Sequence, residues 1–148
     1  MAKEEFVGYD VALLLKQRGF NEETFTYFHI HSREDCEQMS DSEFKSMCES
    51  DWEQEWDGYS FHNKDNKYRA ARCSQQVAMR WLREELKIAI KTVPYITEDN
   101  DFMWAYELLG MEKGIGVFCY GKGAGYNSYE DACEAALIQS LKTPHGKD

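Results

Sequence analysis

The chain has little proline, no long apolar run and no closely spaced cysteines. It contains only two prolines and ten glycines in 148 residues, so its composition excludes collagen-like and low-complexity proteins. No apolar run approaches the roughly 18 residues that a membrane-spanning helix requires. The N-terminal sequence MAKEEFVGYD is too acidic and too poor in apolar residues for a signal peptide. We therefore expect one ordinary domain with no membrane partner, located in the cytoplasm.

The five cysteines are scattered, and no CxxC pair occurs. An odd number of scattered cysteines favours free thiols and a reducing compartment. No known signature of a cysteine nucleophile surrounds any of them, and the carboxylates show no pattern typical of an acid–base pair. The sequence therefore favours a protein that is not an enzyme, with no catalytic residue and no cofactor.

The net charge of −10 is distributed unevenly along the chain. Residues 33–57 contain ten acids against two bases, which gives −8, and residues 64–91 contain eight bases against three acids, which gives +5. The negative total predicts long-range repulsion from nucleic acid. The basic stretch can still provide a local face for a small anion.

The first half of the chain predicts a helix followed by an interrupted hairpin. Apolar spacing indicates a short helix over residues 10–18, and the aromatic run at 25–31 is typical of a strand. Residues 59–62 are expected to return as its partner strand. The segment 33–57 is then an acidic helical insertion in this N-terminal hairpin.

The insertion carries its own helix signals. Ser40 and Glu43 have the spacing of a capping box, in which each side chain satisfies a backbone amide at the helix start. Apolar residues follow at helical spacing and include Trp52 and Trp56. We expect one amphipathic helix that contains both tryptophans.

The second half predicts a helix, three strands and a last helix. The helix covers residues 74–87, with Ser74 as its N-cap, and the last helix begins at Ser128. Short polar or glycine-bearing connections favour hairpins between the strands, expected at 88–96, 102–109 and 115–120. The predicted fold class is α+β: a single domain over residues 1–148, an antiparallel sheet with helices packed on one face, and a frayed tail at 142–148.

A glycine-rich stretch, Gly121–Gly125, falls between the last strand and the last helix. Phosphate-binding loops occupy such positions, but the spacing here is GxGxG and matches neither common nucleotide motif. Glu130 and Asp131 would also repel a phosphate from the first turn of the helix. We expect a flexible connector.

Four segments together resemble a known family. They are Phe6–Tyr9, Leu13–Glu22, Gln76–Glu84 and Tyr129–Ala136. In this order they are similar to a family of small uncharacterised proteins encoded by phages, prophages and mobile elements of gut bacteria. The resemblance covers about two-thirds of the chain and excludes the acidic insertion. It implies a mobile-element origin and the cytoplasm of a bacterial host cell, and it supplies no catalytic residue.

His29 and His31 are the nearest approach to a metal site. They lie on the same face of the predicted strand, and Cys36, Cys48 or His62 would have to complete a zinc site. The spacing matches no standard zinc motif, so we expect no metal.

A basic set is the candidate anion site. Arginine forks match phosphate geometry, and neighbouring aromatics can stack on bases. The alternative is a solvated helix face paired with acids from the insertion. The set consists of Arg69, Arg72, Arg80, Arg83 and Lys87.

The acidic insertion is the candidate partner-binding site. Exposed tryptophans among carboxylates are typical of an interface, and burial of both would weaken this interpretation. The candidate residues are Glu49, Asp51, Trp52, Glu53, Glu55 and Trp56.

The function favoured is that of a small acidic accessory protein of a phage or mobile element. It would bind a host or phage protein, or itself, to counteract a host system. The alternative is a protein that binds or sequesters a nucleotide or nucleotide signal on the basic set.

Overall fold

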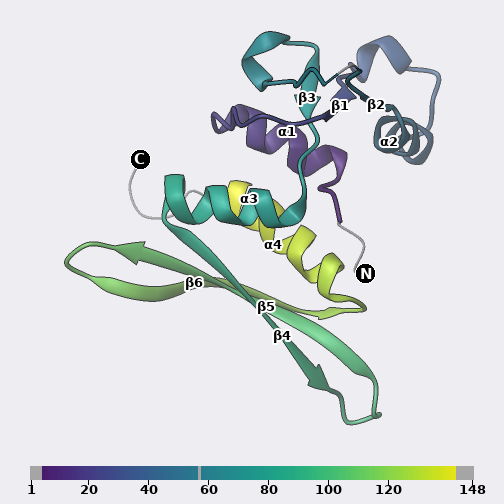
Figure 1. The fold of residues 1–148 in the computed structure, drawn as a ribbon. Helices are drawn as coiled ribbons and strands as arrows, with labels where there is room; N and C mark the ends of the chain where they lie inside the picture. The colour runs from purple at the N-terminus through teal and green to yellow at the C-terminus, as the bar shows by residue number, and fades with distance from the viewer. Residues whose placement is uncertain (1–4, 57, 143–148) are drawn as a thin grey trace. The chain divides into compact units, whose positions relative to one another are not determined.

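The computed structural model describes residues 5–56 and 58–142 and shows an α+β fold with antiparallel sheets, as predicted (Figure 1). The chain forms two compact units. Residues 6–73 make the N-terminal unit, and residues 74–142 with Glu5 make the C-terminal unit. Each unit has its own three-stranded sheet. The structure therefore contains two sheets where the sequence predicts one. The single domain over 1–148 stays a prediction, and the frayed tail lies outside the described residues beyond Lys142.

The N-terminal unit packs one helix and a small sheet around a shared core. Helix α1 buries Val11, Ala12 and Leu15, and its end is followed by Gly19 at φ +95°, which suits glycine. The strand order is β2-β1-β3. The elements are α1 (Tyr9–Gln17), β1 (Thr26–His29), the 3₁₀ helix η1 (Glu34–Cys36), α2 (Asp41–Ser50), β2 (Trp52–Gln54), the 3₁₀ helix η2 (Asn63–Asp65) and β3 (Arg69–Ala71).

The predicted hairpin exists, but its second strand is a different segment. Residues 52–54 pair with β1, and the expected return strand at 59–62 supplies only an isolated bridge between Thr24 and Phe61. The acidic helix α2 does connect two antiparallel strands. Its capping box is confirmed, since the Glu43 amide donates to Ser40 Oγ at 3.2 Å and the Ser40 amide donates to Glu43 at 2.9 Å.

The prediction that Trp52 and Trp56 lie on this helix was wrong. Helix α2 ends at Ser50, and Asp51 adopts φ −94° and ψ 74°. The sequence Asp51–Trp56 alternates charged and uncharged residues, so it fits the two-residue repeat of a strand as well as helical spacing. Pairing with β1 settles the conflict in favour of the strand.

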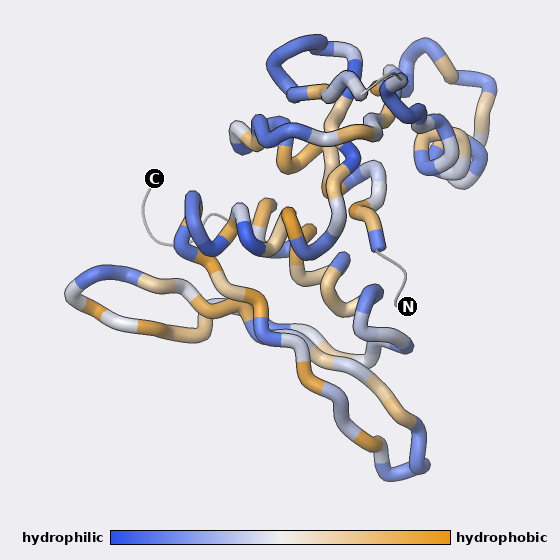
Figure 2. Tube along the Cα trace, in the orientation of Figure 1, coloured by the Kyte–Doolittle hydropathy of each residue, from blue (hydrophilic) through white to orange (hydrophobic). Residues whose placement is uncertain are grey.

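The C-terminal unit is an antiparallel sheet with α3 and α4 on one face (Figure 1). Helix α4 contacts all three strands and α3. Figure 2 shows hydrophilic turns at both hairpin tips, near residues 97–101 and 112–114. The strand order is β4-β5-β6. The elements are α3 (Gln75–Trp81), the π-helical turn η3 (Leu82–Leu86), β4 (Ile88–Ile96), β5 (Phe102–Glu112), β6 (Gly116–Tyr126) and α4 (Tyr129–Lys142).

The glycine-rich stretch is part of strand β6, so the predicted flexible connector was wrong. A Cβ atom at Gly123 would lie 2.6 Å from Tyr106 Cε2, and one at Gly121 would lie 2.9 Å from Gln139 Nε2. Both glycines therefore leave room for side chains between β6 and α4. Close packing therefore accounts for glycine at these two positions of the strand.

Candidate functional site

The segment from Trp52 to Trp56, here called the tryptophan edge, forms the outer strand of the N-terminal sheet and the two residues after it. Side chains alternate across a strand, so Trp52 and Gln54 share one face while Asp51 and Glu53 share the other. Trp52 is 42% exposed and Trp56 is 78% exposed. The burial that would have weakened the interface interpretation is therefore absent at both tryptophans.

The acids of the candidate site contact groups of the same unit. Glu53 Oε2 lies 2.9 Å from His29 Nε2 and accepts a hydrogen bond from the Tyr27 hydroxyl at 3.0 Å. These hydrogen bonds lower the pKa of Glu53. Glu53 thus fastens the outer strand to the central strand and still leaves 57% of its side chain exposed.

The other three acids of the candidate partner-binding site also contact groups of the N-terminal unit. Asp51 Oδ2 lies 2.6 Å from His31 Nε2. Glu55 lies 3.9 Å from the guanidinium of Arg69. Glu49 accepts a hydrogen bond from the Tyr9 amide at 2.9 Å, at the start of α1. The block of negative charge is therefore also a structural network, because its acids link α2 and β2 to their neighbours.

His29 and His31 each face a carboxylate. Among residues 5–56 and 58–142, no group of three or more histidine, cysteine, aspartate or glutamate side chains is placed to hold a metal ion. Neither histidine has Cys36 or Cys48 as a hydrogen-bond partner in the described network. The imidazoles act here as partners of Glu53 and Asp51.

Arg72 lies against aromatic rings. Its guanidinium carbon is 3.9 Å from the centre of the Trp52 ring and 4.2 Å from the centre of the Phe6 ring. Burial lowers the pKa of Arg72. Because the guanidinium covers one side of Trp52, it holds that ring in place on the sheet.

The other members of the basic set are divided between the two units. Arg69 belongs to the N-terminal unit, where its guanidinium carbon lies 4.5 Å from the centre of the Tyr27 ring. Arg80 and Lys87 belong to the C-terminal unit. There Arg80 lies 3.9 Å from Glu84, and Lys87 Nζ donates to the Glu84 carbonyl at 2.7 Å. Arg83 lies exposed on η3 of the same unit. Neither unit holds the whole set, and a bound nucleotide stays a prediction.

None of the five cysteines, all within the described residues, forms a disulfide with another. Cys48 and Cys133 are buried, and burial raises the pKa of both thiols. A raised pKa reduces the reactive thiolate. These two cysteines therefore pack as small apolar residues.

A hollow of about 330 Å³ lies beside the tryptophan edge. Its lining consists of Tyr27, Trp52, Glu53, Gln54, Glu55 and Trp56. Tyr27 and Gln54 were not among the predicted site residues. The signal for Gln54 was present in the alternation of Trp52, Gln54 and Trp56, whereas Tyr27 enters through strand pairing.

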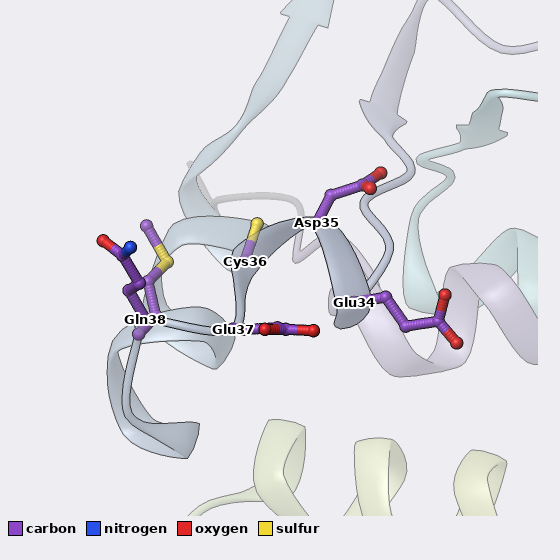
Figure 3. A pocket seen from close by; sticks show the side chains of 6 residues that line it. Glu34, Asp35, Cys36, Glu37 and Gln38 are labelled. Carbon is purple, nitrogen blue, oxygen red and sulfur yellow. The ribbon is translucent and has the colours of Figure 1, made fainter.

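A second hollow of about 510 Å³ lies at the 3₁₀ helix η1 (Figure 3). The carboxylates of Glu34, Asp35 and Glu37 point in different directions around it. Because they do not converge, this hollow lacks the arrangement that a cation or a catalytic pair requires.

Comparison with protein-family models, curated proteins and solved structures gives no match to this chain. The resemblance to proteins of phages and mobile elements therefore stays a prediction. Within residues 5–56 and 58–142, no helix combines the length and the apolar character needed to cross a membrane.

Proposed function

We propose that this protein is a small acidic accessory protein that acts by binding another protein through the tryptophan edge, without catalysis. The observation that carries the proposal is the exposure of Trp52 and Trp56, at 42% and 78%, within the five-residue tryptophan edge. Large aromatic side chains dominate the binding energy of many protein interfaces. Their exposure at the two ends of one short segment, in a charged setting, supports a partner that covers them.

The side chains around the tryptophans are already ordered in the unbound protein. Arg72 stacks on Trp52, and Glu53 is held by Tyr27 and His29. A surface whose side chains are already ordered loses less conformational entropy on binding. The origin in a phage or mobile element, with a host or phage protein as partner, is part of the proposal.

The nucleotide-binding alternative has less support from the geometry. Arg69 and Arg72 lie against rings of their own unit, and Arg69 also lies 3.9 Å from the Glu55 carboxylate, which would repel a phosphate. Arg80 and Lys87 belong to the other unit. A thermal-shift screen with nucleotides tests this alternative, because a ligand at 100 times its Kd stabilises the fold by about 2.7 kcal/mol.

The test of the proposed function is quantitative capture of proteins from bacterial lysate by three forms of the chain. These are the unmodified protein, Trp56→Ser and Tyr68→Ser. Tyr68 is the control because it is an exposed aromatic of the same unit, at 65% exposure, outside the tryptophan edge. We expect Trp56→Ser to lose a partner that Tyr68→Ser retains. Identical capture by all three forms would count against the proposal.

A further inference from the structure

The backbone of β2 has one side paired and one side open. The His29 amide donates to the Asp51 carbonyl at 3.0 Å, and the Glu55 amide donates to the Phe25 carbonyl at 2.8 Å. Residues of an antiparallel strand alternate in the direction of their backbone groups. The amides and carbonyls of Trp52 and Gln54 therefore face the outer edge, where no strand pairs with β2 among the residues that the structure describes.

This edge is short and carries acids, but it lacks the lysine and proline that commonly protect strand edges. Proteins often place lysine or proline on an edge strand to prevent pairing with another chain. The edge strand β4 of the C-terminal unit carries Lys91 and Pro94. Residues 52–56 contain neither lysine nor proline. Hydrophobic rings stand at both ends of the segment, so an added strand would find apolar anchors two positions apart on either side of Gln54.

The local charge favours a basic occupant. Residues 33–57 carry −8, and Glu53 remains 57% exposed although it is bonded to His29. A second copy of this strand would place Glu53 and Glu55 against like charges, which disfavours self-pairing. An extended peptide that carries lysine or arginine would instead bring opposite charges to the edge.

We propose that β2 takes up an extended basic segment of the partner protein as a fourth strand of the β2-β1-β3 sheet. Backbone hydrogen bonds to Trp52 and Gln54 supply affinity, and the hollow lined by Trp52 and Trp56 receives a side chain of the added strand. Strand addition to an open edge is a recurrent mode of peptide recognition. This inference rests on the proposed function, because it specifies how the tryptophan edge binds.

Two substitutions at Gln54 distinguish backbone pairing from side-chain contact. Its amide faces outward, so Gln54→Pro removes a donor from the open edge without removing a hydrogen bond to β1. Gln54→Ala removes only the side chain. The probe is the peptide most enriched when a display library of short random peptides is selected on the intact protein, with binding followed by tryptophan fluorescence.

We expect the enriched peptide to be rich in lysine and arginine. Trp56→Ala should weaken its binding by roughly tenfold or more. Gln54→Pro should bind it roughly tenfold or more weakly than Gln54→Ala, because both variants lose the same side chain and only Gln54→Ala keeps the backbone amide. The same peptide, N-methylated at alternate amides, should lose binding to the unmodified protein, which keeps the test decisive if Gln54→Pro fails to fold.

Three outcomes would overturn strand addition. They are the absence of any enriched peptide, an enriched peptide that is acidic, and full binding by both Gln54→Pro and the N-methylated peptide. If Trp56→Ala alone weakened binding, the tryptophans would still bind a partner, so the proposed function would stand while strand addition failed. If no variant weakened binding, both would fail.

Discussion

Arg72 shows how a residue suited to anion binding can serve the fold. Its guanidinium lies 3.9 Å from the ring centre of Trp52 and 4.2 Å from that of Phe6. Partly buried contacts of this kind contribute about 1–2 kcal/mol. The role of Arg72 could not be predicted from its neighbours in the sequence, because Phe6 and Trp52 reach it only through folding.

Replacement of Arg72 by methionine should therefore lower the stability of the fold. We expect Arg72→Met to reduce the free energy of unfolding by about 1–2 kcal/mol, because the cation is lost from both rings. Arg83→Met, at an exposed position of η3, should change it by less than about 0.5 kcal/mol. Urea unfolding measures both, and equal effects would contradict the structural role of Arg72.

Glu53 gives the N-terminal unit a specific dependence on pH. Hydrogen bonds from His29 and Tyr27 lower its pKa from the ordinary value of 4.5. A carboxyl group with a lowered folded-state pKa stabilises the fold fully above its unfolded pKa, and this contribution is lost as the pH falls through the folded value.

The difference in unfolding free energy between the unmodified protein and Glu53→Gln should therefore shrink as the pH falls below 4.5. Denaturant unfolding at a series of pH values measures this difference. A difference that grows as the pH falls, or one that is independent of pH, would be inconsistent with the bonding of Glu53 to His29 and Tyr27.

At the scale of elements, the packing of strand β6 requires glycine, which has no side chain, at Gly121 and Gly123. Gly123 faces Tyr106, whose Cε2 would lie 2.6 Å from an added Cβ atom. The Tyr106 hydroxyl donates to Gln139 of α4, and burial raises the pKa of Tyr106 to about 12. Tyr106 is therefore fixed between the sheet and the helix and cannot easily move aside.

Gly123→Ala should consequently destabilise the protein by about 1–3 kcal/mol through overpacking. Lys122→Ala, at the exposed neighbouring position, serves as the control and should have little effect. In a Tyr106→Ala background the cost of Gly123→Ala should largely disappear, because the clashing ring is gone. Thermal unfolding of the four variants measures this coupling, and an undiminished cost in that background would rule out the proposed clash.

Elements with a single strong pattern were predictable from the sequence. The apolar stripes of α1 and α4 and the strands β4 and β5 lie close to their expected positions. The segment around Trp52 supports both helical and strand spacing, so only pairing with β1 decides its structure. The stretch Gly121–Gly125 resembles a loop in composition, and its strand character depends on Tyr106 and Gln139, which are distant in sequence.

At the scale of the whole molecule, the acidic block has two roles. It carries −8 of the net charge of −10, and three of its ten acids, Asp51, Glu53 and Glu55, contact His31, His29 and Arg69. The residue types of the candidate site were identifiable from the sequence. The sequence did not show which of these residues hold the strand and which stay exposed. That difference depends on the face of β2 that each residue occupies.

The most direct test of the central claim is the affinity of Trp56→Ser and of Tyr68→Ser for a partner captured by the unmodified protein. Isothermal titration with the purified partner measures both. We expect Trp56→Ser to raise the Kd by roughly tenfold or more, about 1.4 kcal/mol, and Tyr68→Ser to leave it nearly unchanged. Equal Kd values for Trp56→Ser and the unmodified protein would contradict a partner-binding role of the tryptophan edge.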